Sequence, residues 1–253
     1  MAKKPIKLDP DDGLIVGEVG PWATEKHDRL WKYIRASRGA RAKFLPPLGK
    51  GGASYIELYS GAGRSLITGT SQIIDGSAIV AFKAARDSGH LFSELHLSDI
   101  DDQNSSALAE RIRSLGGAAI SYVGDAEIVV DQVMSAINPY GLHFAFLDPF
   151  NLGQLPFSII KRMLRVQRMD MIIHVSLQDL QRNLDEYSRV GGTLDNFAPG
   201  RRNAIDTRQS MAALRAALLI IGSRLSARWG HIPRLVSLSL SAGETSVSIG
   251  WSS

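Results

Sequence analysis

Tyr55-Ile56-Glu57-Leu58-Tyr59-Ser60-Gly61-Ala62-Gly63 is the stretch that decides the fold of this chain. The apolar run predicts a buried strand, and the glycines after it predict a tight turn whose backbone amides can approach a ligand closely. Candidate cofactor-binding residues are Glu57, Ser60, Gly61 and Gly63. Leu66 stands where a dinucleotide fingerprint has its third glycine, which disfavours pyrophosphate binding. A tight strand exit without a ligand is the alternative.

Strand and helix patterns alternate after this loop. Strands are predicted near 54–59, 93–98, 119–123, 142–147 and 170–176, and helices over 78–86, 103–115, 128–137 and 157–166. This alternation predicts an α/β, doubly wound sheet of parallel strands with right-handed crossovers. Two alternating runs, 235–240 and 245–251, predict an antiparallel hairpin. A mostly parallel seven-stranded sheet that ends in such a hairpin is typical of class I methyltransferases, whereas an NAD-binding domain continues with a parallel sixth strand.

The segments at either end of this pattern have a different character. Residues 1–21 lack a periodic apolar face and predict an extended arm that is ordered only by docking. Thr24 is a candidate cap for a helix that carries Leu30, Trp31 and Ile34. We therefore divide the chain into an arm and helix over 1–52 and a main domain over 53–253. Within that domain, 178–230 predicts a helical, arginine-rich insertion that contacts substrate or is solvated surface.

Composition excludes several classes of function. The 253-residue chain has a net charge of +4 and no cysteine, so disulfides, thiolate metal sites and a cysteine nucleophile are excluded. The six histidines show no metal-binding spacing, and no metal is expected. No apolar run resembles a signal peptide or a membrane span, so we expect a cytoplasmic protein without membrane contact. The arginines leave an RNA or DNA partner open.

Acidic residues follow two further strands at the same sheet edge. Asp99 directly follows the 93–98 strand, at a position where a carboxylate can accept hydrogen bonds from both hydroxyls of a ribose. Asp101 and Asp102 are more simply explained as caps of the next helix. Asp125 follows the third strand and is a candidate for contact with an adenine amino group, with helix capping as an equal alternative.

The segment Phe144-Ala145-Phe146-Leu147-Asp148-Pro149-Phe150-Asn151 carries the candidate reaction centre. A buried strand delivers an acid, a proline and an aromatic residue to the edge where open α/β sheets bind ligands. The segment resembles motif IV of amino-group methyltransferases. An exocyclic amine is a poor nucleophile, so hydrogen-bond acceptors must hold it in line with the methyl group. Asp148 and the Pro149 carbonyl are candidate acceptors, and Phe150 is a candidate for stacking on a base. A strand-to-loop turn is the alternative.

Six segments in order resemble the three-Cys-motif partner protein family over residues 20–185: Pro21 to His27, Glu57 to Gly63, Asp75-Gly76-Ser77, Asp99, Gly124-Asp125 and Leu147 to Phe150. The resemblance implies a class I methyltransferase-like fold, S-adenosylmethionine as cofactor, and a separate partner protein with three cysteines. The chain departs from the family pattern at four places: Glu57 replaces an aspartate, Ser60-Gly61-Ala62-Gly63 replaces A-G-P-G, Ala78 replaces a proline and Asn151 replaces a glycine.

The leading hypothesis is methyl transfer from S-adenosylmethionine to an amino nitrogen. Asp148, Pro149 and Phe150 would present the acceptor, and the short D-P-F motif, which is similar to that of transfer-RNA guanine N2-methyltransferases, suggests RNA or another nucleobase substrate. The competing hypothesis is a non-catalytic adaptor that keeps the fold and binds a partner protein. An NAD-dependent oxidoreductase is disfavoured by Leu66 and by the closing hairpin.

Overall fold

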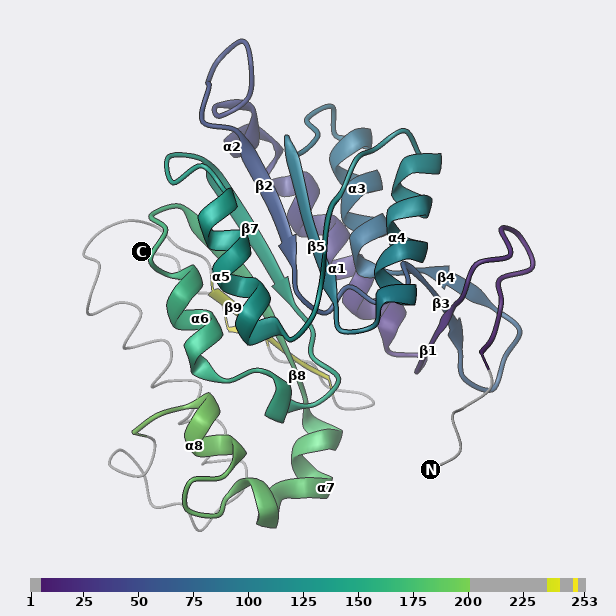
Figure 1. Ribbon diagram of the computed structural model, residues 1–253, viewed down its shortest axis with the longest axis vertical. Coiled ribbons are helices and arrows are strands. Elements are labelled where there is room, and N and C mark those ends of the chain that lie inside the picture. The colour runs from purple at the N-terminus through teal and green to yellow at the C-terminus, as the bar shows by residue number, and fades with distance from the viewer. Residues whose placement is uncertain (1–5, 201–235, 242–247, 250–253) are drawn as a thin grey trace. The chain divides into compact units, whose positions relative to one another are not determined.

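A computed structural model describes residues 6–200, 236–241 and 248–249 of the chain (Figure 1). The chain has an α/β fold in which a mostly parallel sheet is flanked by helices. It forms two compact units, Met1–Ala145 and Phe146–Ser253. Strand β7 (Leu142–Leu147) begins in the first unit and ends in the second. All five predicted parallel strands are present.

The sheet of the first unit has β2 (Ala53–Glu57) near its centre. On one side β2 pairs in parallel with β5 (Glu94–Asp99), and β5 pairs in parallel with β6 (Ile120–Val123). On the other side lies the start of β7, whose Leu142 N–H donates to the Gly52 carbonyl at 3.0 Å. Every residue of β2 is buried, as expected for a strand covered on both faces. The carboxyl ends of β2 and β5 therefore lie side by side.

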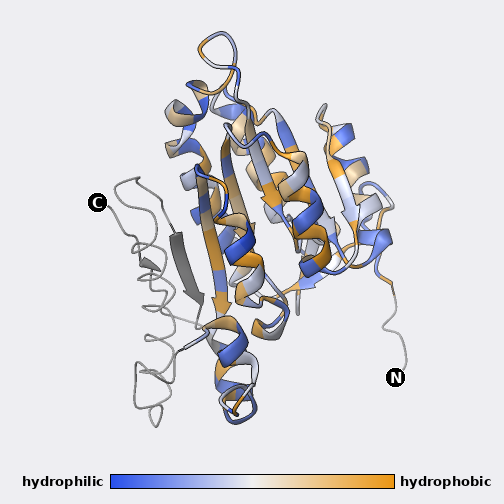
Figure 2. Ribbon diagram, turned by 60° about the vertical axis from the view of Figure 1, so that its left-hand side comes forward, coloured by the Kyte–Doolittle hydropathy of each residue, from blue (hydrophilic) through white to orange (hydrophobic). Residues whose placement is uncertain are grey.

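Five helices belong to the first unit: α1 (Ala23–Ala36), α2 (Arg38–Ala42), α3 (Ser77–Asp87), α4 (Asp102–Ser114) and α5 (Ala126–Ala136). Figure 2 shows hydrophobic colour along much of the central strands, while the helices alternate between hydrophobic and hydrophilic residues. Leu30 and Ile34 are fully buried where α1 packs against α3. The Asp101 carboxylate accepts from the Gln103 N–H at 2.9 Å and caps α4, as predicted. The predicted Thr24 cap is wrong, because the helix already begins at Ala23 and the Thr24 hydroxyl donates to the Pro21 carbonyl.

A small second sheet orders the N-terminal arm, which we define as residues 6–19. Strand β1 (Gly17–Val19) pairs in parallel with β3 (Arg64–Ile67), and β3 pairs antiparallel with β4 (Ile73–Asp75). The glycine loop thus continues into strand β3 and not into a helix. The arm is ordered by docking, as the sequence predicted, but its strand pairing was not predicted.

The second unit contains the end of β7 and a further parallel pair. Strand β8 (Met169–Ser176) pairs in parallel with β9 (Val236–Ser241), and β9 pairs antiparallel with β10 (Ser248–Ile249). The helices among the described residues of this unit are η1 (Leu152–Gln154), α6 (Phe157–Met163), α7 (Leu177–Tyr187) and α8 (Thr193–Phe197).

Part of the predicted C-terminal organisation lies outside the described residues. Strand β9 overlaps the first of the two runs predicted to form the hairpin and β10 lies within the second, but residues 242–247 between them are not described. The complete seven-stranded sheet therefore stays a prediction. Helices α7 and α8 occupy the start of the predicted arginine-rich insertion, while its remainder, 201–230, lies outside the described residues.

Candidate functional site

The glycine loop Ser60–Gly63 is fixed to the end of the neighbouring strand. The backbone N–H and the hydroxyl of Ser60 both donate to the Ser98 carbonyl at 2.9 Å. The next backbone N–H, of Gly61, donates to Asp99 Oδ2, also at 2.9 Å. Three predicted site residues, Ser60, Gly61 and Asp99, therefore meet at the carboxyl ends of β2 and β5. This is the edge where open α/β sheets bind their ligands.

The two glycines of the loop have different roles. Gly61 has a φ of +59°, and a Cβ built on it would meet no atom within 4 Å, so open space lies above it. Gly63 has a φ of +88°, and a Cβ there would lie 2.7 Å from Leu108 Cδ1 on α4. Its carbonyl accepts from the Gly76 N–H at 2.6 Å just before α3. Open space therefore adjoins the loop at Gly61, whereas Gly63 allows close packing against Leu108 of α4 and Ile79 of α3.

Asp99 is held in a defined orientation. Its Oδ1 accepts from the Asp101 N–H at 3.0 Å and from Asn104 Nδ2 at 3.1 Å, in addition to the bond from Gly61 to Oδ2. The side chain is half-buried. A carboxylate has about four acceptor positions, so these three bonds leave capacity for a ligand hydroxyl.

Glu57 lies in the core beneath the loop. Its side chain is fully buried, and its two oxygens accept hydrogen bonds from the hydroxyls of Tyr55, at 2.6 Å, and Ser77. The bond to Ser77 joins the end of β2 to the first residue of α3. Glu57 thus holds the framework of the site, and its predicted contact with a cofactor stays a prediction.

Asp125 lies at the end of the third strand of this edge. Its carboxylate accepts from the Glu127 N–H at 2.7 Å and caps α5, the alternative that the sequence left open. The preceding Gly124 N–H donates to the Asp99 carbonyl at 3.1 Å, which holds the two strand ends together. Burial raises the pKa of the Tyr59 phenol well above its usual value, and the charges of Asp125 and Glu127 raise it further.

Three exposed apolar side chains, which were not predicted from the sequence, neighbour these acids. Ile100 is 73% exposed and follows Asp99, while Val123 is 55% exposed and pairs in register with Asp99. Ile128, 65% exposed, lies in the first turn of α5. Apolar residues adjacent to strand-end acids were the available signal. They give this edge an apolar surface beside polar groups, which suits a flat heterocycle.

The predicted acceptor residues Asp148, Pro149 and Phe150 belong to the second unit. They follow β7 directly, and Phe150 is 89% exposed. Hydrogen bonds that hold the loop include one from the Phe150 N–H to Gln154 Oε1 at 3.2 Å and one from the Leu152 N–H to Asp179 Oδ2 at 3.0 Å. Phe150 is therefore presented to solvent from a fixed backbone.

Asp179 on α7, which was not predicted as a site residue, anchors this loop. Besides Leu152, its carboxylate accepts from Asn183 Nδ2 at 2.9 Å and from the Tyr187 hydroxyl at 3.1 Å. Burial, followed by the hydrogen bond to Asp179, raises the pKa of Tyr187 to about 12. The phenol therefore remains a hydrogen-bond donor at neutral pH, and α7 fixes the Asp148–Asn151 loop.

No protein-family model and no curated protein sequence matches the chain. Within the described residues, no helix has the length and apolar character needed to span a bilayer. Across the same part of the chain, no three or more histidine or acidic side chains gather as metal ligands would.

Proposed function

We propose that this chain is an S-adenosylmethionine-dependent methyltransferase that acts on an amino nitrogen. The observation that carries the proposal is the hydrogen bond from the Gly61 N–H to Asp99 at 2.9 Å, with open space above Gly61. A glycine turn and a carboxylate on adjacent strand ends are what an adenosine-containing cofactor requires. The proposed fold is the class I methyltransferase sheet, with seven strands and a closing hairpin.

The residues around Gly61 fit this cofactor. Asp99 has acceptor capacity for ribose hydroxyls, and Ile100 and Val123 offer apolar contact for the adenine ring. Bound S-adenosylmethionine would supply an electrophilic methyl group on a sulfonium. An NAD cofactor fits less well, because the loop continues into β3 and no helix N-terminus directly follows it to receive a pyrophosphate.

The acceptor is assigned to the Asp148–Phe150 segment. In this proposal the Asp148 carboxylate and the Pro149 carbonyl accept hydrogen bonds from the amine and so direct its lone pair toward the methyl group. Phe150, 89% exposed, offers its ring face to a nucleobase. The proposed substrate is an exocyclic amine of RNA or DNA, and the three-Cys-motif protein is a proposed partner.

A non-catalytic adaptor is the second candidate. Two observations favour it: both Glu57 oxygens are already bonded within the core, and the exposed Phe150 and Val190 suit a protein surface as well as a base. In this alternative the methyltransferase fold is retained and its exposed groups bind the partner protein.

Two measurements separate the candidates. Calorimetric titration with S-adenosylmethionine, S-adenosylhomocysteine and NAD tests the pocket, and we expect only the first two to bind. Transfer of labelled methyl from S-adenosylmethionine is then measured on RNA, DNA and protein fractions, with Asp148→Ala as the variant and Asp131→Ala on α5 as the control. We expect Asp148→Ala alone to lose transfer. Cofactor binding without any transfer would favour the adaptor, and unchanged transfer in Asp148→Ala would remove Asp148 from the mechanism.

A further inference from the structure

The N-terminal arm folds into an acidic turn of its own. Leu8 and Ile15 form an antiparallel bridge, and the Gly13 N–H donates to the Asp9 carbonyl at 2.8 Å. The turn between them carries three carboxylates, on Asp9, Asp11 and Asp12. Asp9 is fully buried, which requires a charged partner.

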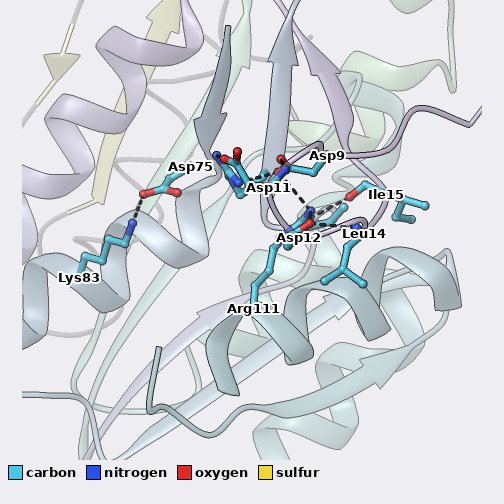
Figure 3. A network of polar contacts seen from close by, with 10 residues as sticks. Asp9, Asp11, Asp12, Leu14, Ile15, Asp75, Lys83 and Arg111 are labelled. Carbon is cyan, nitrogen blue, oxygen red and sulfur yellow. Dashed lines mark hydrogen bonds and ion pairs between the residues drawn. The ribbon is translucent and has the colours of Figure 1, made fainter. Parts of the chain in front are cut away.

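Two arginines of the same unit, Arg64 and Arg111, form ion pairs with these carboxylates, and Figure 3 labels Arg111 beside the turn. Arg64, on β3, lies 2.7 Å from Asp9 Oδ2 and 3.0 Å from Asp11 Oδ2. Arg111 extends from α4 toward the turn, and its Nε and Nη2 donate to the two oxygens of Asp12 at 2.8 and 2.9 Å. This bidentate geometry is available to a guanidinium and not to an ammonium group.

Arg111 differs from Arg64 because it also holds the glycine loop. Its Nη1 donates to the Ala62 carbonyl at 2.6 Å and to the Ile15 carbonyl at 2.8 Å. The Arg111 side chain is only 4% exposed, so these are buried, charge-assisted hydrogen bonds. One side chain therefore joins α4, the arm and the residue between the two loop glycines.

Ala62, whose carbonyl Arg111 holds, lies between the two glycines of the loop. The Gly61 N–H on one side of Ala62 bonds Asp99, and Gly63 on the other side packs against Leu108 of α4. A shift of the Ala62 carbonyl moves the peptide planes of the loop and with them the Gly61 N–H. The arm carboxylate of Asp12 orients the guanidinium that holds this carbonyl.

We propose that Arg111 is a positioning residue of the cofactor site and that the N-terminal arm, through Asp12, forms part of that site. The inference rests on the proposed function, because the ligand it concerns is S-adenosylmethionine. By reciprocity, cofactor binding stabilises the docked arm by the same factor by which the docked arm strengthens cofactor binding.

The test compares Arg111→Lys with the matched control Arg64→Lys in the full chain. Both variants keep the positive charge and weaken the docking of the arm, but only Arg111→Lys removes the hydrogen bond to the Ala62 carbonyl. We measure S-adenosylhomocysteine affinity by calorimetry and hydrogen exchange of peptides over the arm and over 58–63. Both variants should speed exchange in the arm, but in Arg64→Lys the intact contact between Asp12 and Arg111 keeps the arm docked in most molecules, so the affinity of that variant is unaffected. Only Arg111→Lys should speed exchange in the glycine loop and weaken S-adenosylhomocysteine binding by about tenfold, equivalent to ~1.4 kcal/mol.

Two results would overturn the inference. One is that Arg111→Lys keeps the wild-type exchange rate in the glycine loop and the wild-type affinity for S-adenosylhomocysteine. The other is that Arg64→Lys speeds loop exchange and weakens affinity as much as Arg111→Lys does, which marks a merely structural role. If Arg111→Lys fails to fold, Asp12→Asn is used, because it keeps the bond to Ala62 and removes the ion pair. Unchanged affinity in Asp12→Asn contradicts the role of the arm. If the wild type binds no methionine derivative, the proposed function fails, and loop exchange alone decides the role of Arg111.

Discussion

Alanine substitution of each of the two loop glycines tests which glycine is needed for packing and which for ligand binding. Both residues have positive φ, at +59° for Gly61 and +88° for Gly63, where an L-residue costs about 1–2 kcal/mol. At Gly61 this backbone strain is the whole cost, because a Cβ would meet nothing within 4 Å. We therefore expect Gly61→Ala to lower the free energy of unfolding by about 1 kcal/mol.

Gly63→Ala adds a steric cost to the same strain. The new Cβ would lie 2.7 Å from Leu108 Cδ1 and 3.2 Å from Ile79 Cδ1. Both neighbours are about as buried as residues can be, at 1% and 2% exposure, so neither can move aside freely. Overpacking of this kind costs about 1–3 kcal/mol, and the expected total loss is about 3 kcal/mol.

The assay is urea unfolding followed by circular dichroism, together with calorimetric titration of S-adenosylhomocysteine. Gly63→Ala should be the less stable variant, whereas Gly61→Ala should be the weaker binder, by at least about tenfold, because its methyl group enters the space left for the ligand. Equal stability losses would refute the packing role of Gly63. Unchanged affinity in Gly61→Ala would refute the assignment of that space to a cofactor.

Three further predictions concern the acids and the acceptor loop. The hydrogen bond from Arg111 holds the pKa of Asp12 below the ordinary value of an aspartate, so the contribution of Asp12 to stability is complete above about pH 4 and is lost as pH falls through the lowered pKa. The stability difference between wild type and Asp12→Asn, measured by urea unfolding, should shrink over that acid range, and a constant difference would contradict the ion pair. The pKa of Tyr187 is raised to about 12, so the stability of the wild type should fall as pH rises from 10 to about 12. Tyr187→Phe should be about 1 kcal/mol less stable at neutral pH and should not show this alkaline loss of stability. Asp179→Ala should reduce methyl transfer without changing S-adenosylhomocysteine affinity, and an equal loss of both would show that Asp179 acts through general stability.

The fold was predictable where local pattern and tertiary structure agree. The apolar strands and the helices between them were found because burial on both faces of a sheet leaves a continuous apolar run. Strands β1, β3 and β4 were missed because they have only three or four residues and are stabilised by distant pairing, Gly17 with Ser65 for example. Thr24 was mistaken for a cap because a capping residue type does not fix where a helix begins.

The candidate site was likewise predictable from the sequence only in part. The meeting of Gly61 and Asp99 was predictable, because adjacent parallel strands end at one edge of a sheet. Arg111 was not, since its partner Asp12 lies 99 positions away in the sequence. Asp179 was hidden for a similar reason: it reads as an ordinary acid in the first turn of α7, and only the fold brings the Leu152 N–H to it.

The most direct test of the central claim is calorimetric titration of S-adenosylhomocysteine into the wild type and Asp99→Ala, with NAD as the competing ligand. Asp99 bonds the Gly61 N–H and retains acceptor capacity, so the claim is that this carboxylate holds the cofactor ribose. The prediction is saturable binding to the wild type, at least about tenfold weaker binding to Asp99→Ala, and no binding of NAD. Absence of S-adenosylhomocysteine binding to the wild type, or equal affinity in Asp99→Ala, would contradict the assignment.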